Sequence, residues 1–592
     1  MGQPAECRLA GGVGRFEGIW VAAIAALGVC QSMMFFGYKQ MPVPDFPAII
    51  QTGHELLSLK MPTSFTRAPV VGMLQATLSH VVGGPHPDLT AGWLLSALVH
   101  PCSLVLFALL ARRIVGAAAI WLTLIVAVNP YLLRVLAEPL IEAPLLFFVL
   151  LTSYLIVRRS RWRYGLASIT SMVRYEGAAL IVAAFIMDMI ESPNRKARVR
   201  AFLWSALASL PLAIWLAATW ITWRPDNGHY LEMMFVEGSV PAIGPMHGTS
   251  HSVRTHLETL WKVSIQPLLV PGNSPPGDVV KAVWQVSKGA AACGLASALF
   301  YGLRRRHPVV LVLVMFAVPY FLVHVAWSYL TRRHYVAIMG MAVVLCWFGL
   351  VELRRRIIER FGVQRRLDAV LQACAIGVAV AGCLCLARQV TSPPAAGWRF
   401  VCMTVMTLAV AGWMFVRRLA MDGRRALLRE GCILASMCLF VLSNQTVLGR
   451  VMGDRYTDIE FKHLARWYVE NAGPDEKMVT SLSSTVALFV PGDRDRFVHT
   501  GSIRADSPKD FVRKCRDQGI IYVVWDSRLG RFPENYHYRL WGLENVAPLA
   551  EPVGNDDYEF LTRITVSEER FLNIFRVRPS DGPVSDGFGQ DK

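Results

Sequence analysis

The chain of 592 residues is too apolar for a soluble protein of its size, with 54% hydrophobic residues, 17% charged residues and a mean hydropathy of +0.38. Repeated apolar runs of about 17–25 residues, each long enough to cross a hydrocarbon core, explain this composition. The formal net charge of +17 does not indicate a nucleic-acid partner, because the arginine clusters lie in short segments between apolar runs, as in the cytoplasmic loops of membrane proteins. The composition therefore predicts an α-helical polytopic membrane protein.

The apolar runs predict about 11–13 transmembrane helices within a domain that covers residues 18–453. No small-residue cleavage site follows the first run, so we expect a signal anchor that leaves residues 1–17 in the cytoplasm. With the basic segments placed in the cytoplasm, the long spans lie at 18–37, 91–111, 117–133, 140–157, 201–222, 286–303, 308–328, 334–352, 368–386, 399–416 and 431–448. Two short apolar pieces, 164–173 and 176–190, are expected to cross as a pair whose junction lies near the outer face.

Two long segments are expected on the outer side of the membrane, at residues 38–90 and 224–285. The first contains an amphipathic helix pattern from Ala48 to Leu59, and the second is rich in Pro, Gly and His. Long loops of this kind are often functional.

The pattern changes after residue 453, where charged residues become frequent and apolar runs shorten. Helices are expected at 456–471, 483–489 and 508–518, and strands at 477–481, 496–500, 519–525 and 571–578. Strands that alternate with helices indicate a partly parallel sheet. We therefore predict an extracytoplasmic α/β domain over residues 454–592.

Asp45 is the first acidic residue after the first span. It precedes Phe46-Pro47 and a helical pattern, so one interpretation is a helix N-cap. The other is a catalytic base, and the two are compatible because a carboxylate at the start of a helix is held rigidly.

A second acidic site, Glu138 and Glu142, lies where the third span ends and the fourth begins. Ionisable residues near membrane depth usually face a cavity or a partner. Glu138 is compatible with a solvated loop position, whereas Glu142 lies closer to the apolar run and is harder to place in water.

Two arginine elements are expected on the outer side. Arg174 and Glu176, in the junction between the short apolar pieces, form either a structural ion pair or an anion site that faces an outer cavity. Arg332, Arg333 and His334 lie between two spans, against the positive-inside trend. Guanidinium groups bind phosphate through paired hydrogen bonds, and the alternative for this cluster is snorkelling toward lipid headgroups.

The histidines of the outer segments show no metal-binding spacing such as H-E-x-x-H. His54, within the amphipathic helix pattern, is a candidate for positioning the acceptor or the donor.

Several short elements follow one another in a recognisable order: Asp45, the segment from Gly53 to Pro69, Gly83-Gly84, Arg112-Arg113, Asn129-Pro130 with Glu142, Arg174-Tyr175-Glu176-Gly177, and Arg333-His334-Tyr335. The set resembles the GT-C superfamily of integral-membrane glycosyltransferases. The branch is the bacterial one with the protein O-mannosyltransferase-like enzymes, the lipid A aminoarabinose transferase and the lipopolysaccharide sugar transferases. The sequence departs from the usual pattern at Phe46 and at Ala68-Pro69, where a double proline is common.

The resemblance implies a hexosyl- or pentosyltransferase that takes its sugar from a polyprenyl-phosphate donor. A lipid phosphate is a good leaving group, so the reaction needs a base for the acceptor hydroxyl and positive charge for the leaving phosphate. A single displacement would invert the anomeric centre. The resemblance implies Asp45 as the base, Glu142, Glu138 and His54 in positioning the substrates, and Arg174, Arg333, Arg332 and His334 in binding phosphate.

The expected acceptor is a lipid, a glycan or a protein outside the cytoplasm, and the expected location is the bacterial inner (cytoplasmic) membrane, with membrane lipids as further partners. No cofactor follows from these residues, although Asp45 and Glu142 would suit Mg²⁺ or Mn²⁺ if a divalent cation took part. A transporter or flippase for lipid-linked sugars or anions is the alternative. Transporter folds often carry internal repeats, and none is clear here.

Overall fold

The computed structural model describes residues 15–62, 67–192, 194–221, 253–264, 278–325, 332–362, 451–452, 458–490, 492, 494–503, 505–527 and 543–579. The spans predicted at 368–386, 399–416 and 431–448, and most of the outer segment 224–285, lie outside the described residues.

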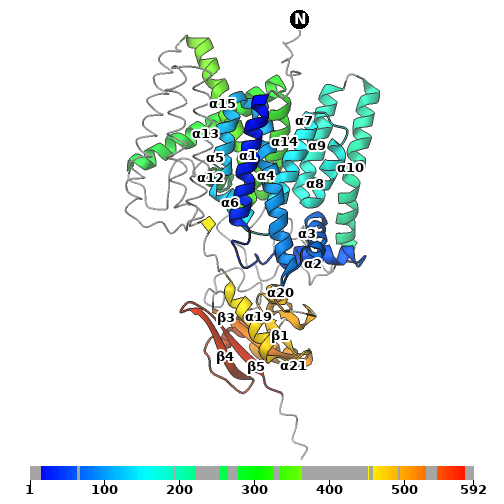
Figure 1. The fold of residues 1–592 in the computed structure, drawn as a ribbon, viewed down its shortest axis with the longest axis vertical. Coiled ribbons are helices and arrows are strands. Elements are labelled where there is room, and N and C mark those ends of the chain that lie inside the picture. Colours follow the sequence, from blue (N-terminus) through cyan, green and yellow to red (C-terminus); the bar gives the residue numbers. More distant parts are fainter. Residues whose placement is uncertain are drawn as a thin grey trace, which may run out of the picture.

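Helices packed side by side form the larger part of the structure, and a smaller domain with a sheet lies at one end of them (Figure 1). The helices of the larger part are α1 (Arg15–Phe35), α2 (Phe46–Leu57), α3 (Pro69–Val81), α4 (Pro87–Val115), α5 (Ala119–Ala127), α6 (Pro130–Ala137), α7 (Glu142–Val157), α8 (Arg163–Val173), α9 (Ala179–Glu191), α10 (Arg195–Ile221), α12 (Val253–Ser264), α13 (Asp278–Arg305), α14 (Pro308–Val325) and α15 (Val336–Phe361). Short 3₁₀ turns, η2 (Tyr175–Ala178) and η5 (Arg332–Tyr335), precede α9 and α15.

Among the described residues, five helical segments are long and apolar enough to cross a membrane: α1, α4, α10, α14 and the segment formed by η5 and α15. The chain is a polytopic helical membrane protein, as its composition predicts.

The span predicted at 117–133 is not one helix. It is broken into α5 and α6, which are bent by 54°. Pro130 has no amide hydrogen to continue the ladder, and the side chain of Asn129 instead accepts hydrogen bonds from the amides of Tyr131 and Leu132. The Asn-Pro pair therefore ends one helix and caps the next.

The first outer segment folds into the hairpin of α2 and α3, which lies between the long helices and the smaller domain (Figure 1). The two helices approach closely where Gly53 faces Gly72. A Cβ atom added at Gly53 would lie 2.1 Å from the carbonyl oxygen of Gly72, so a side chain there forces the backbones apart.

We expect Gly53→Ala to destabilise the protein by about 1–3 kcal/mol, because overpacking displaces one backbone from the other. The measurement is the midpoint of thermal unfolding in detergent. Gly165→Ala in α8 is the matched control, since its Cβ would meet nothing within 4 Å and alanine is the better helix former. An unchanged midpoint for Gly53→Ala would contradict the close crossing.

The smaller domain contains a five-stranded sheet in the order β2-β1-β3-β5-β4. Its strands are β1 (Lys477–Thr480), β2 (Phe497–His499), β3 (Ile520–Asp526), β4 (Tyr558–Ser567) and β5 (Arg570–Val577). Strand β1 is parallel to β2 and β3, while β5 is antiparallel to β3 and β4, which confirms the partly parallel sheet.

Helices cover both faces of this sheet. The helices α19 (Ile459–Asn471) and α20 (Ser483–Ala487) contribute to one apolar core, and α21 (Pro508–Asp517) contributes to the other. Met41, from the segment between α1 and α2, is buried in the core that contains α19 and α20. The smaller domain is therefore packed directly on the first outer segment.

Candidate functional site

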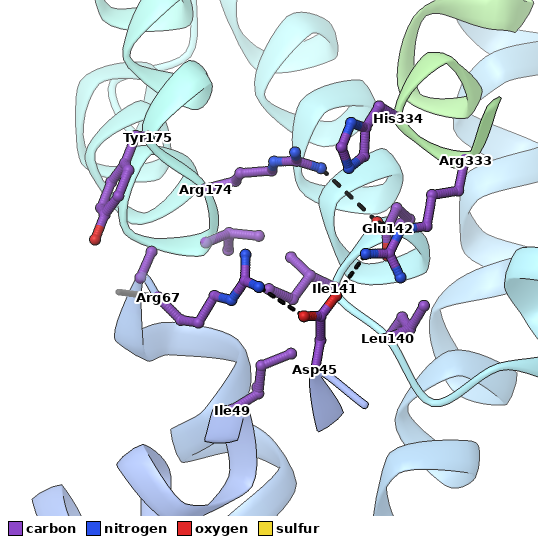
Figure 2. Close-up of a pocket in the computed structure, with 12 residues that line it drawn as sticks. Asp45, Ile49, Arg67, Leu140, Ile141, Glu142, Arg174, Tyr175, Arg333 and His334 are labelled. Carbon is purple, nitrogen blue, oxygen red and sulfur yellow. Dashed lines mark hydrogen bonds and ion pairs between the residues drawn. The ribbon is translucent and has the colours of Figure 1, made fainter. Parts of the chain in front are cut away.

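An open pocket lies at the end of the helices that faces the smaller domain, next to the start of α2. Its volume is about 440 Å³, including the space open to solvent. Residues from five separate parts of the chain line it: Asp45, Ile49, Arg67, Ala68, Leu140, Ile141, Glu142, Val173, Arg174, Tyr175, Arg333 and His334. Figure 2 shows their charged side chains turned toward one another.

Asp45 directly precedes α2, but its side chain makes no capping hydrogen bond. Its Oδ1 accepts a hydrogen bond of 2.7 Å from Nη2 of Arg67, and its Oδ2 accepts one of 2.5 Å from Nη2 of Arg333 (Figure 2). Burial raises the pKa of Asp45, but the charges of Arg67 and Arg333 outweigh burial and lower this pKa to about 2. Asp45 is therefore ionised and held between two guanidinium groups.

Glu142 lies in the first turn of α7 with 4% of its surface exposed. Its Oε1 is 3.5 Å from Nε of Arg333 and 3.8 Å from Nη1 of Arg174. Its Oε2 is buried and makes no hydrogen bond within the part of the chain that the structure describes. A buried acceptor without a partner is costly.

Arg174 reaches the pocket from the extended residue between α8 and η2. Its Nε donates to Oε1 of Glu176 at 3.1 Å, and its Nη2 lies 3.4 Å from Nε2 of His324 in α14. Gly177 permits this tight turn, because a Cβ there would lie 2.3 Å from the carbonyl oxygen of Thr170.

Arg333 and His334 belong to η5, the turn that opens α15. The carbonyl oxygen of His334 accepts a hydrogen bond of 2.6 Å from the hydroxyl of Tyr320 in α14, which fixes the turn. The ring of His334 lies 5.0 Å from that of His324, between centroids. The turn therefore presents Arg333 to two carboxylates at once, those of Asp45 and Glu142.

Positive and negative side chains pair with one another in and beside the pocket. Three guanidinium groups, those of Arg67, Arg174 and Arg333, face the carboxylates of Asp45, Glu142 and Glu176. An anion that entered the pocket would bind by taking guanidinium groups from these carboxylates.

Five of the residues singled out in the sequence line this pocket: Asp45, Glu142, Arg174, Arg333 and His334. Three others, His54, Glu138 and Arg332, do not.

Each of these three has a partner elsewhere. Nε2 of His54 is 2.8 Å from Oδ1 of Asp88, Oε1 of Glu138 accepts from Arg134 at 2.9 Å, and Arg332 donates to the hydroxyl of Tyr131 at 3.2 Å. Their positions in the sequence place these residues near the site, but the direction of each side chain depends on how the folded elements pack.

Two residues of the cluster were missed by sequence reasoning. Arg67 directly precedes Ala68-Pro69 at the start of α3, and a lone arginine in a largely apolar outer segment was the signal that could have marked it. His324 lies within an apolar span, where an ionisable residue is a functional candidate by default.

Asp45 and Glu142 do not form a cation site. Arg333 is paired with both carboxylates, and Arg67 occupies the other oxygen of Asp45. Within the described residues, no group of three or more His, Cys, Asp or Glu side chains is placed to hold a metal ion. These two paired carboxylates therefore do not fit Mg²⁺ or Mn²⁺.

No protein-family model and no curated protein sequence matches the chain. Among solved structures, ArnT from Cupriavidus metallidurans bound to undecaprenyl phosphate is 14% identical, covers 95% of this chain and 98% of its own, and gives a TM-score of 0.50. The apo state of the same ArnT is 15% identical, with coverage of 94% and 98% and a TM-score of 0.51.

An oligosaccharyltransferase from Archaeoglobus fulgidus also matches at 12% identity, over 93% of this chain and 74% of its own. Its TM-score is 0.46. At identities this low, the likeness to ArnT shows the fold alone. The chain shares the fold of ArnT along most of its length, as the order of its sequence elements predicts.

Proposed function

We propose that this protein is a membrane glycosyltransferase that moves a hexosyl or pentosyl group from a polyprenyl-phosphate donor to an extracytoplasmic acceptor. The observation that carries the proposal is the pocket itself, in which one clamped carboxylate, Asp45, lies among Arg67, Arg174 and Arg333. The chemistry of the donor needs both parts, a base for the acceptor and positive charge for the leaving phosphate. The structure of ArnT with undecaprenyl phosphate bound supports the class of donor, since the fold is shared.

In this proposal the donor phosphate binds Arg174 and Arg333 and draws Arg333 away from Asp45. Bidentate hydrogen bonds make arginine well suited to phosphate. When the charge of Arg333 turns to the phosphate, it no longer lowers the pKa of Asp45, which becomes a stronger base. Asp45 then takes the proton of the acceptor hydroxyl as that oxygen attacks the anomeric carbon and the lipid phosphate leaves, which inverts the anomeric centre.

Glu142 positions the substrate that carries hydroxyl groups into the pocket. Its Oε1 faces Arg174 and Arg333, whereas its buried Oε2 is available to accept a hydrogen bond. His334 lies beside Arg174 and lines the pocket. We assign it to the phosphate side, where a ring N–H can donate.

The proposal also fixes an orientation. The start of α2, which lines the pocket, lies at the end of the long helices next to the α/β domain (Figure 1). The basic clusters Arg112-Arg113 and Arg158-Arg159 lie at the opposite ends of α4 and α7. By the positive-inside rule, the site and this domain face away from the cytoplasm, which for a bacterial inner membrane is the side on which lipid-linked sugars meet acceptors of the cell envelope.

The experiment that tests the proposal is transfer by the purified full-length protein in liposomes. A panel of undecaprenyl-phosphate sugars labelled in the sugar is supplied with lipid, glycan and peptide acceptors. We expect release of undecaprenyl phosphate with label appearing in one acceptor. Movement of an intact labelled donor across the bilayer without any release of undecaprenyl phosphate would overturn the proposal in favour of a transporter.

A further inference from the structure

Helix α2 packs against the α/β domain as well as against the membrane helix α4. Phe46 and Ile50 of α2 form a buried cluster with Leu89 of α4, and Leu488 and Phe489 of the α/β domain pack against it. Figure 1 shows α20, which ends just before these two residues, next to α2. Phe46 is fully buried and directly follows Asp45 in the chain, so this contact lies next to the candidate base.

An ion-pair network crosses the same contact. Asp88, at the start of α4, binds two partners with its two oxygens: Oδ1 is 2.8 Å from Nε2 of His54 in α2, and Oδ2 is 2.7 Å from Nη2 of Arg494 in the α/β domain. The Asp88 side chain is only 14% exposed. Removing Arg494, which is 36% exposed, would leave the more buried Asp88 carboxylate with one partner fewer.

This ion-pair network contacts the C-terminal part of helix α2, and Asp45 directly precedes the N-terminus of the same helix. His54 lies toward the end of α2, and Asp45 precedes its first residue. A helix of 12 residues is about 18 Å long, so a change of tilt at the His54 end moves the Asp45 end. Gly92 of α4 leaves room for the ring of Phe46, with a Cβ at Gly92 lying 2.7 Å from Cε2 of Phe46.

We infer that Arg494 of the α/β domain is a positioning residue for the transfer site, which acts through Asp88 and His54 on α2 and so on Asp45. The inference rests on the proposed function for its catalytic consequence, but not for the mechanical coupling. It gives the α/β domain a part in the reaction even though none of the residues described in that domain lines the pocket.

Two measurements on full-length protein test this inference with Arg494→Gln. Hydrogen exchange of the α2 amides, residues 46–57, should accelerate, while the core strand β3 stays protected. The kcat for transfer should fall by about 10–100-fold, while the KM for the lipid donor stays within about 3-fold, because the arginines that bind phosphate are intact. Arg494→Lys, which keeps the charge, should restore part of the protection of α2 and part of kcat.

Arg513→Gln is the matched control. Arg513 pairs with Asp510 on the surface of the same domain and is 71% exposed, so exchange in α2 and kcat should both stay unchanged. Asp88→Asn removes the α4 partner of the same ion pair, Arg494–Asp88. It should reproduce the exchange pattern of Arg494→Gln.

Unchanged exchange of α2 in both Arg494→Gln and Asp88→Asn would overturn the coupling. Faster exchange with an unchanged kcat would overturn the positioning role. If the wild-type protein transfers no sugar from any donor, the proposed function fails, and the exchange measurement still decides the coupling.

Discussion

Asp45→Asn is expected to lower the rate of sugar transfer by about 10²–10⁴-fold, the usual contribution of a general base. The amide keeps the shape of the side chain but cannot accept a proton from the acceptor hydroxyl. Single-turnover transfer from a pre-bound lipid donor measures the effect without the contribution of binding. Glu55→Gln is the control on the same helix, because Glu55 hydrogen-bonds to Gln51 of α2 and does not line the pocket.

The same substitution also tests stability, and the sign of the effect follows from the pKa. Asp45 has a folded-state pKa of about 2, below its ordinary value of 3.8. The corresponding stabilisation, about 2 kcal/mol, is complete above about pH 5 and is lost as the pH falls through 2. Asp45→Asn should therefore lower the thermal midpoint at pH 7, by an amount that shrinks as the pH falls through 2. A loss of transfer no larger than that of Glu55→Gln, in folded protein, would remove Asp45 from the reaction.

Arg333→Gln is expected to have the second large effect, because this side chain is paired with both acids of the pocket. Its loss leaves Asp45 with Arg67 alone and Glu142 with the more distant Arg174. Removing one guanidinium that stabilises developing charge should slow transfer by about 10²–10³-fold. Binding of undecaprenyl phosphate should weaken in parallel, as measured by microscale thermophoresis in detergent.

Two comparison variants separate the phosphate role from a loss of folding. Arg333→Lys keeps the charge but loses the bidentate geometry, so its affinity for undecaprenyl phosphate should be intermediate. Arg332→Gln removes the neighbouring arginine, which binds Tyr131 outside the pocket, and should have the smaller effect on binding. Equal losses for Arg332→Gln and Arg333→Gln would show that general positive charge, not the pocket geometry, binds the lipid phosphate.

The fold could be predicted from this sequence because its signals are local and strong. Long apolar runs separated by arginine clusters indicate spans, and alternating short strands and helices after residue 453 indicate the α/β domain. Strand β4 was missed because it carries polar and charged residues at the edge of the sheet, where only one neighbour stabilises it. The break at Asn129-Pro130 was missed because its apolar composition is that of a continuous span.

The candidate site could be predicted only in part. Asp45, Glu142, Arg174 and Arg333 stood out because ionisable groups next to apolar spans need partners. Their exact pairing depends on how separate helices meet, which no local pattern encodes. Arg67 shows this limit, since it reaches Asp45 only because α3 folds back on α2 at Gly53 and Gly72.

The position of a bound lipid phosphate tests the central claim most directly. A cryo-electron microscopy structure of the full-length protein with undecaprenyl phosphate would locate the phosphorus atom. The account predicts that the phosphate oxygens lie within hydrogen-bond distance of Arg174 and Arg333 and that the ion pair between Arg333 and Asp45 is broken. A phosphate bound elsewhere, with Asp45 still clamped between Arg67 and Arg333, would contradict it.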